Sequence, residues 1–262
     1  MKGLKKYKHK EREQVVNELV PLIKKRVGKN LVALAAQGSF ARNEDIDYSD
    51  LELIAFVKKI DRDKKIAGMG KIRNGLLVEL IYTTKESYIK EVKEPTESWY
   101  IAGSDKLMPI INKTFIERLN RYKAKNLKKR CLNHAAKHWY EVQESTAKVF
   151  NAVLKKNRTG IPLLVFDMYL HMLRVLSFLN QHPYTTFSKF IEESMRFKTK
   201  PRHFYELTKI VVEGKYQHLT GLRKTTEKVF SEFENIFDEL GFDLYYDNLD
   251  PGKPMKDWAI EK

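Results

Sequence analysis

The stretch that decides the fold is residues 38–52, which read GSFARNEDIDYSDLE. One apolar run, residues 31–36, precedes it, and a second, residues 53–57, follows it. This pattern predicts a strand, a turn of small residues, a short helical turn and a second strand. Glycine lets the backbone approach a ligand closely and a helix start favours anions, so the Gly38-Ser39 turn is expected to offer N–H groups and a hydroxyl to a phosphate.

The second feature of the stretch is a pair of carboxylates, Asp50 and Glu52, at the start of the second strand. Strand side chains alternate between faces, so these two project from the same face. Carboxylates beside a phosphate cradle suit hard cations such as Mg²⁺, and two such ions about 3.5–4 Å apart can clamp the reacting oxygens of a phosphoryl-type transfer. Either feature alone is typical of an ordinary turn or a solvated strand end, but their combination indicates a functional site.

The combined pattern Gly-Ser-x-x-Arg-x5-Tyr-Ser-Asp-x-Glu resembles the signature of the polymerase-β-like nucleotidyltransferases. Glu at the last position is similar to the kanamycin nucleotidyltransferase branch of that family. The resemblance implies Mg²⁺, as two ions, held by Asp50 and Glu52, with ATP or another NTP as co-substrate. It also implies a set of nucleotide-binding residues: Gly38, Ser39, Arg42, Ser49 and Lys148.

The order of the expected elements predicts an α+β chain. Apolar periodicity predicts an amphipathic helix ending near Gly28, a helix at 85–94 and strands at 31–37, 51–57 and 76–82. The resemblance implies a late strand near 107–111, ahead of the domain linker. Residues 115–130 are expected to be helical and very basic. Further helices are expected at 126–156, 160–181, 185–196, 202–213 and 219–240. With the resemblance, this predicts a nucleotidyltransferase domain with a mixed β-sheet and flanking helices at 1–125, then a C-terminal α-helical bundle at 126–262.

Glu79 is the one charged residue in the strand expected at 76–82. It either points to solvent on an edge strand or faces the same side as Asp50 and Glu52. The kanamycin enzyme has a Glu at the matching place on the substrate side, so the resemblance implies a substrate-binding role for Glu79.

A second group of candidates lies on the first helix of the bundle. Helical spacing puts Glu141, Glu144 and Lys148 on one face, where a simple surface ion pair is the plain interpretation. The resemblance implies that Glu144 is the base for an acceptor hydroxyl, that Lys148 contacts nucleotide phosphate, and that Glu141 binds substrate. It further implies a homodimer whose subunits share their active sites.

Composition limits the class of protein. The chain has 262 residues, a formal net charge of +15 and a single cysteine, Cys131. One cysteine forms no internal disulfide and suits a reducing compartment, so a cytoplasmic location is expected. The apolar window 161–179 carries Asp167, His171 and Arg174, which predicts a buried bundle helix and no membrane span.

The acceptor is the open question. Polycationic aminoglycosides such as kanamycin are the leading candidates by resemblance, yet residues 64–73 are basic where that family carries a further acid. The positive charge and the basic run 118–130 favour RNA as an alternative acceptor, although a solvated helix face explains that run equally well. A non-catalytic nucleic-acid-binding module is the third hypothesis, disfavoured by the intact Asp50 and Glu52 pair.

Overall fold

The computed structural model describes residues 3–60, 69–103, 106–244 and 260–261. The chain divides into two compact units, Met1–Ala124 and Lys125–Lys262. Each unit has its own core and is described by itself.

The N-terminal unit is built on a five-stranded mixed sheet of order β3-β4-β2-β1-β5. Its strands are β1 (Leu31–Gln37), β2 (Leu51–Val57), β3 (Met69–Arg73), β4 (Leu76–Thr83) and β5 (Met108–Ile111). β2 runs parallel to β4, whereas the pairs β1–β2, β1–β5 and β3–β4 are antiparallel. The strands expected at 31–37, 51–57 and 76–82 are therefore confirmed.

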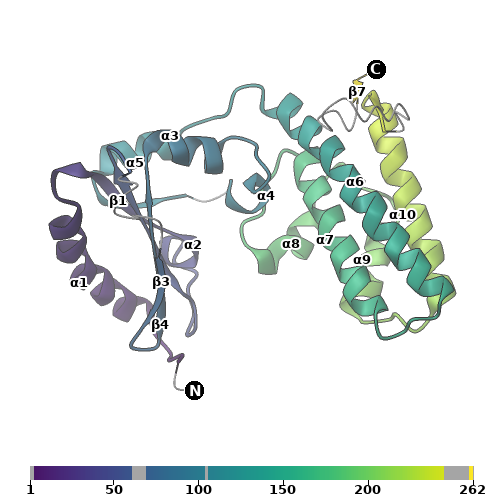
Figure 1. Cartoon of the computed structure of the whole chain (residues 1–262), viewed down its shortest axis with the longest axis horizontal. Helices are drawn as coiled ribbons and strands as arrows, with labels where there is room; N and C mark the ends of the chain where they lie inside the picture. Colours follow the sequence, from purple (N-terminus) through teal and green to yellow (C-terminus); the bar gives the residue numbers. More distant parts are fainter. Residues whose placement is uncertain (1–2, 61–68, 104–105, 245–259, 262) are drawn as a thin grey trace. The chain divides into compact units, whose positions relative to one another are not determined.

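Helices cover both faces of this sheet (Figure 1). They are α1 (His9–Val27), α2 (Gly38–Ala41), α3 (Lys85–Tyr88), α4 (Trp99–Ala102) and α5 (Lys113–Asn120), with short helical turns η1 (Gly28–Asn30) and η2 (Ile89–Lys93). α1 packs Val16 and Ile23 against one face of the sheet. α3 and α5 pack against the other face, where Phe56 of β2 meets Tyr88 at a centroid distance of 5.2 Å.

Alternation along the strands assigns each side chain to one of the two faces. Leu51, Leu53, Ala55 and Val57 of β2 belong to the α1 core, and Ile54 and Phe56 belong to the opposite core. Glu52 shares its parity with Ile54 and therefore lies on the α3/α5 face. β4 pairs with β2 in register, with Glu79 directly beside Glu52, so both carboxylates lie on that face.

The C-terminal unit is a bundle of helices. Its elements are α6 (Leu127–Leu154), α7 (Ile161–Leu179), η3 (Phe187–Lys189), α8 (Phe190–Met195), α9 (Phe204–Val212) and α10 (Leu219–Glu239), with a small strand pair, β6 (Phe242–Asp243) and β7 (Ile260–Glu261). Trp139 of α6 is 1% exposed and packs against Phe230, Phe233 and Phe237 of α10. Burial of one such aromatic side chain contributes roughly 3 kcal/mol to the core. The predicted α-helical bundle, and with it the α+β fold class, is confirmed.

One expected helix differs from the structure. Residues 115–130 do not form a single helix, because α5 ends at Asn120 and α6 begins at Leu127. Asn126 has a left-handed backbone conformation (φ 51°), which no α-helix can pass through, and it is the N-cap residue of α6. The side chain of Asn120 is turned back onto Leu107, with hydrogen bonds of 2.9 Å to both its N–H and its C=O. The basic run is therefore divided between two helices and a connection.

α7 is long and apolar enough to cross a membrane by length and composition. Over half of its apolar window, 56%, is buried inside the protein. Tyr169, Met172 and Leu173 are among its buried residues. The helix therefore packs as a core helix of the bundle, in the manner expected from the three ionisable groups in its sequence.

Candidate functional site

The candidate site of the N-terminal unit begins at the turn between β1 and α2. Gly38 has a positive φ of 68°, and a Cβ atom at this position would lie 1.7 Å from Oε2 of Glu52. Only glycine allows the carboxylate to come this close. Gln37, opposite Glu52 in the β1–β2 register, donates a 3.2 Å hydrogen bond from Nε2 to Oε1 of Glu52. The fold thus brings the Gly-Ser turn and the Glu52 carboxylate into direct contact.

Three carboxylates gather on this edge of the sheet. Asp50 stands two positions before Glu52, and Glu79 is the in-register neighbour of Glu52 on β4. Within the described ranges, the carboxylates of Asp50 and Glu79 have no hydrogen-bond or ion-pair partner. Like charges on neighbouring strands repel each other, so this arrangement favours a cation as its missing partner.

The basic residues of β3 point away from these carboxylates. Lys71 and Arg73 pair with Val78 and Leu76, two residues of the α1 core, and so lie on the α1 face. Arg73 donates to Glu18 of α1 at 2.7 Å. Gly70, which adds no side chain, is the β3 neighbour of Glu79. The rest of the expected basic stretch, with Lys64 and Lys65, lies outside the described residues.

The predicted nucleotide-binding residues of this unit surround the same turn. Ser39 occupies the first turn of α2, where helix geometry leaves N–H groups without intrahelical acceptors. Arg42 ends α2, and its Nε donates to Glu44 at 2.9 Å. The hydroxyl of Ser49 accepts a 3.0 Å hydrogen bond from the N–H of Ile46. Arg42 and Ser49 therefore stabilise the connection between α2 and β2, and their nucleotide-binding role stays a prediction.

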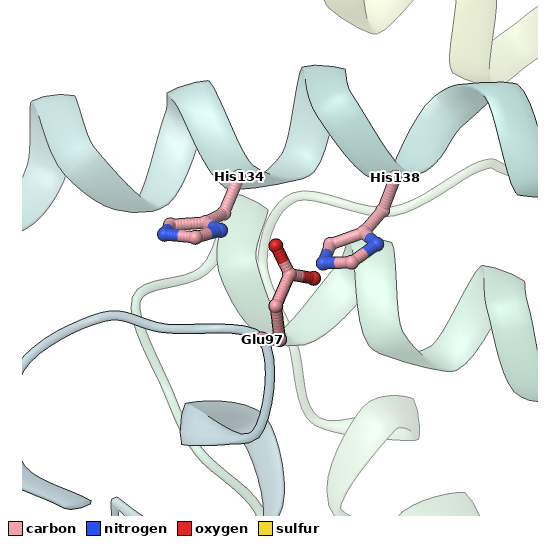
Figure 2. A group of neighbouring side chains, drawn as sticks. All are labelled: Glu97, His134 and His138. Carbon is pink, nitrogen blue, oxygen red and sulfur yellow. The ribbon is translucent and has the colours of Figure 1, made fainter. Parts of the chain in front are cut away.

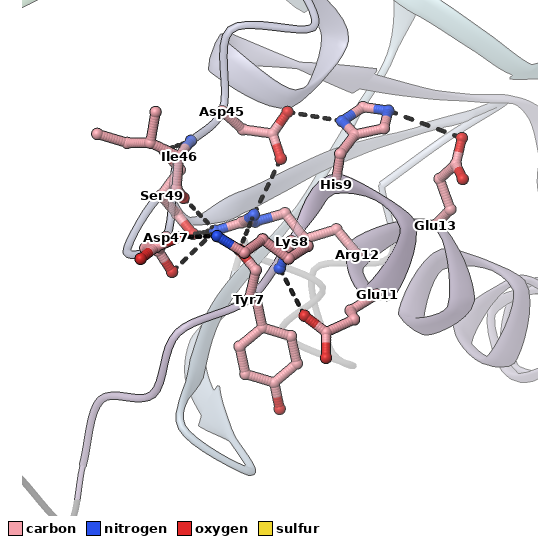
Figure 3. Close-up of polar contacts among 10 residues, drawn as sticks. All are labelled: Tyr7, Lys8, His9, Glu11, Arg12, Glu13, Asp45, Ile46, Asp47 and Ser49. Atoms are coloured by element: carbon pink, nitrogen blue, oxygen red, sulfur yellow. Dashed lines mark hydrogen bonds and ion pairs between the residues drawn. The ribbon is translucent and has the colours of Figure 1, made fainter.

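Sequence reasoning missed one part of this region. No role was predicted for Arg12, yet its side chain has no exposed surface and lies 2.9 Å from Oδ2 of Asp45 (Figure 3). A signal was available in the sequence: Arg12, Val16, Leu19 and Ile23 recur at helical spacing. An arginine in the apolar stripe of an amphipathic helix indicates a buried and fully paired guanidinium.

In the C-terminal unit, Glu144 and Lys148 form an ion pair of 2.9 Å along α6. Their side chains are 51% and 50% exposed. The hydrogen bond to Glu144 and its negative charge raise the pKa of Lys148 above the usual value. Exposure leaves the Glu144 carboxylate open to an approaching hydroxyl group, and its role as a base stays a prediction.

Glu141 lies in a polar cluster between α6 and α7. Its Oε2 accepts a 3.0 Å hydrogen bond from Nη1 of Arg174 and lies 2.8 Å from Nδ1 of His138 and 3.6 Å from Nδ1 of His171. His171 in turn lies 3.6 Å from Asp167. The carboxylate of Glu141 is thus already surrounded by cationic and imidazole groups of its own unit.

The two histidines of α6, His134 and His138, lie one turn apart on that helix (Figure 2). The rings of His134 and His138 stack against Phe178 of α7, at centroid distances of 5.1 and 5.5 Å. Burial raises the pKa of the Cys131 thiol to about 12, so this cysteine stays protonated at neutral pH and is a poor metal ligand.

The carboxylates of the N-terminal unit have the chemistry that a hard divalent cation requires. Oxygen is the ligand atom that Mg²⁺ prefers, and Mg²⁺ sites in proteins use one or two carboxylates plus substrate phosphates. Asp50 and Glu52 can supply these carboxylates beside the turn at Gly38. The residues therefore fit the cation that the sequence predicts.

The comparisons with known proteins agree with this fold. Residues 125–243 match the family model described as the KNTase C-terminal domain. The chain is also similar to a solved structure of a nucleotidyltransferase-like protein from Exiguobacterium sibiricum 255-15, with 13% sequence identity, a TM-score of 0.47, and coverage of 86% of this chain and 75% of that chain. That similarity is too low to carry an argument. No curated protein matches the chain.

The match to the KNTase C-terminal domain covers most of the helical unit and less than half of the chain. It supports a similarity of the helical unit to that domain, and in this chain the unit follows a mixed five-stranded sheet.

Proposed function

We propose that this protein is a Mg²⁺-dependent nucleotidyltransferase that transfers AMP from ATP to a hydroxyl group of a small-molecule acceptor, with an aminoglycoside such as kanamycin as the leading acceptor. The observation that supports it best is the contact between the Gly38 turn and Glu52, with Asp50 and Glu79 beside them. A turn that can bind phosphate, beside carboxylates that can hold metal ions at one strand end, is what nucleotidyl transfer requires.

In this proposal each residue has one task. The N–H groups of the Gly38-Ser39 turn bind the triphosphate, and Asp50 and Glu52 hold the metal. Glu144 accepts the proton of the acceptor hydroxyl, whose oxygen bonds to the α-phosphorus while the bond to the β-phosphate oxygen breaks and pyrophosphate leaves. Mg²⁺, when bound, supplies positive charge that stabilises the developing negative charge on the phosphates. Lys148 contributes a further positive charge.

An aminoglycoside acceptor is supported by the charge of the carboxylate face. Glu79 has no partner among the described residues, and the nearby cations Lys71 and Arg73 lie on the opposite face of the sheet. A polyamine substrate would find uncompensated negative charge there. Glu141 offers less, because Arg174 already neutralises its carboxylate and the His138 ring lies 2.8 Å from it.

The deciding experiment is pyrophosphate release from ATP with and without kanamycin, in the presence of Mg²⁺. Release that needs both kanamycin and Asp50 supports the proposal, and glucose, which has hydroxyl groups but no amines, is the control acceptor. Glu144→Ala should lower the rate and leave ATP binding intact. Loss of ATP binding in this variant would argue against its role as the base.

RNA is the second candidate acceptor, because the chain carries a net charge of +15. Polycations bind nucleic acid with an affinity that falls steeply with salt. Turnover on an RNA end, with no stimulation by kanamycin, would favour this function. Pyrophosphate release of either kind would exclude a non-catalytic binding module.

We further propose that the protein acts as a homodimer in the cytoplasm, on the strength of the resemblance to the kanamycin enzyme. Sedimentation velocity would measure the dimer directly. Mixing Asp50→Asn and Glu144→Ala subunits would then show whether active sites are shared, because shared sites regain part of the lost turnover in such a mixture.

A further inference from the structure

The guanidinium group of Arg12 is saturated with hydrogen bonds. Its Nε and Nη2 donate to the carbonyl oxygen of Ser49 at 3.2 and 2.6 Å. Nη2 also donates to the carbonyl of Ile46 at 2.8 Å, and Nη1 donates to the carbonyl of Tyr7 at 2.7 Å and to Oδ2 of Asp45 at 2.9 Å (Figure 3). Arginine has five N–H donors, and each has an acceptor here.

The carbonyl of Ser49 is the important acceptor, because it belongs to the peptide group that joins Ser49 to Asp50. A peptide group is planar, so fixing its oxygen fixes the orientation of the whole unit. Two N–H groups of one rigid guanidinium hold this oxygen. The backbone that carries the Asp50 side chain is therefore held from α1.

The first turns of α1 also contact the Gly38-Ser39 turn, the other part of the candidate site. His9 lies 2.6 Å from Oδ1 of Asp45, and its ring stacks on Phe40 with the centroids 4.7 Å apart. Phe40 directly follows Ser39 of the Gly38-Ser39 turn. One helix end thus contacts both the turn at Ser39 and the connection that leads to Asp50.

Stability alone is a poor explanation for this arrangement. Arg12 and the side chain of Asp45 are 0% and 1% exposed. Replacing a buried ion pair by apolar residues of similar size is often neutral or stabilising, whereas a planar guanidinium fixes the direction of its partners. The arrangement is better suited to fixing a geometry than to adding stability.

We propose that Arg12 is a positioning residue for Asp50, which holds the Ser49–Asp50 peptide group so that the Asp50 carboxylate is aimed at the metal. This inference rests on the proposed function, in which Asp50 is a metal ligand. His9 supports Arg12 in this role, because it contacts Asp45 and packs against Phe40 beside the Gly38-Ser39 turn. The metal site thus depends on a residue of α1 that is distant from it in sequence.

The test is a titration of the full-length protein with Mn²⁺, with free Mn²⁺ measured by electron paramagnetic resonance. Arg12→Lys keeps the charge opposite Asp45 but replaces the planar fork, in which Nε and Nη2 both hold the Ser49 carbonyl, by a single Nζ atom. Its Kd for Mn²⁺ should rise by at least about tenfold, the effect of losing a residue that orients a ligand. The matched control Arg73→Lys changes an arginine whose partner, Glu18, is exposed, and should stay within about twofold of the wild type.

The outcomes separate this inference from the proposed function. A role in stability alone would lower the melting temperature of Arg12→Lys and leave the Kd of the folded protein unchanged, which would overturn the inference. Wild-type protein that binds Mn²⁺ no better than Asp50→Asn would overturn the metal site itself, and the inference with it. Should Arg12→Lys not fold, His9→Ala replaces it, because His9 is 32% exposed. A Kd for His9→Ala that rises about threefold would support the inference, and an unchanged Kd would overturn it.

Discussion

Glu79 and Glu141 are carboxylates in opposite electrostatic situations. Glu79 lies beside Glu52 on the neighbouring strand, near Asp50, with no cationic partner in the described part of the chain. Glu141 is bonded to Arg174 at 3.0 Å and lies close to His138. The first carboxylate has no compensating charge among the described residues, whereas the second is neutralised by Arg174 of its own unit. A carboxylate whose charge is not compensated by a neighbouring cation is therefore a better candidate for a binding site than one that is already paired.

The largest effect is expected from Asp50→Asn, which removes a charge from the cluster that needs an external cation. Turnover should fall by at least about 100-fold, because neutralisation of the phosphates during transfer depends on the metal. The melting temperature should change little. Glu18→Gln is the matched control, since it removes an exposed carboxylate that already has Arg73 as its partner. Near-normal pyrophosphate release by Asp50→Asn would show that the cluster is structural.

Gly38→Ala should damage the same cluster through its shape. The added methyl group would overlap Oε2 of Glu52, 1.7 Å away, and the positive φ costs roughly 1–2 kcal/mol in addition. Gly28→Ala is the matched control, because Gly28 also has a positive φ but no atom within 4 Å of the added Cβ. Urea unfolding should show that both variants lose stability. Metal affinity and turnover should fall in Gly38→Ala alone, and an equal loss in both would refute the importance of the contact with Glu52.

Removing the charge of Glu79 and removing the charge of Glu141 should change the free energy of unfolding in opposite directions. Glu79→Gln relieves repulsion from Glu52 and should stabilise the metal-free protein by about 0.2–1 kcal/mol. Glu141→Gln leaves Arg174 without its carboxylate and should destabilise by about 1–2 kcal/mol, a buried-pair value reduced because Glu141 is 38% exposed. Urea midpoints in EDTA measure both. Shifts of the same sign would mean that the two carboxylates do not differ in the way described.

The smallest effect is expected from pH acting on the connection before Asp50. Hydrogen bonds from Lys8 and Lys6 lower the pKa of Asp47 below its usual value of 3.8. A carboxylate with a lowered folded-state pKa stabilises the protein above its unfolded-state pKa and loses this contribution as pH falls through the folded value. Asp47→Asn should therefore melt slightly below the wild type at pH 7, and the difference should vanish as the pH falls through the lowered folded-state pKa of Asp47. A difference that persists in acid would exclude these ion pairs as its cause.

Local patterns predicted most of the elements of this fold. Apolar runs bounded by turn residues gave β1 and β2 with their correct bounds, because a strand buried on both faces needs a continuous apolar segment. Helical periodicity gave α6, α7 and α10 to within a few residues. The break between α5 and α6 was missed, because the left-handed conformation of Asn126 follows from the chain's path and has no equally clear local signal.

The sequence by itself determined the order of strands and helices, the glycine turn and the two carboxylates that follow it, since strand alternation and turn chemistry act between near neighbours. Only the tertiary structure decided which groups meet. Pairing of β2 with β4 placed Glu79 beside Glu52. Packing of α6 on α7 brought Glu141 within hydrogen-bond distance of Arg174. Packing of α1 on the sheet brought Arg12 to the carbonyl oxygen of Ser49. The physical reason is that the partners of a charge are set by through-space distance, and a residue many positions away along the chain can be the nearest neighbour once the chain is folded.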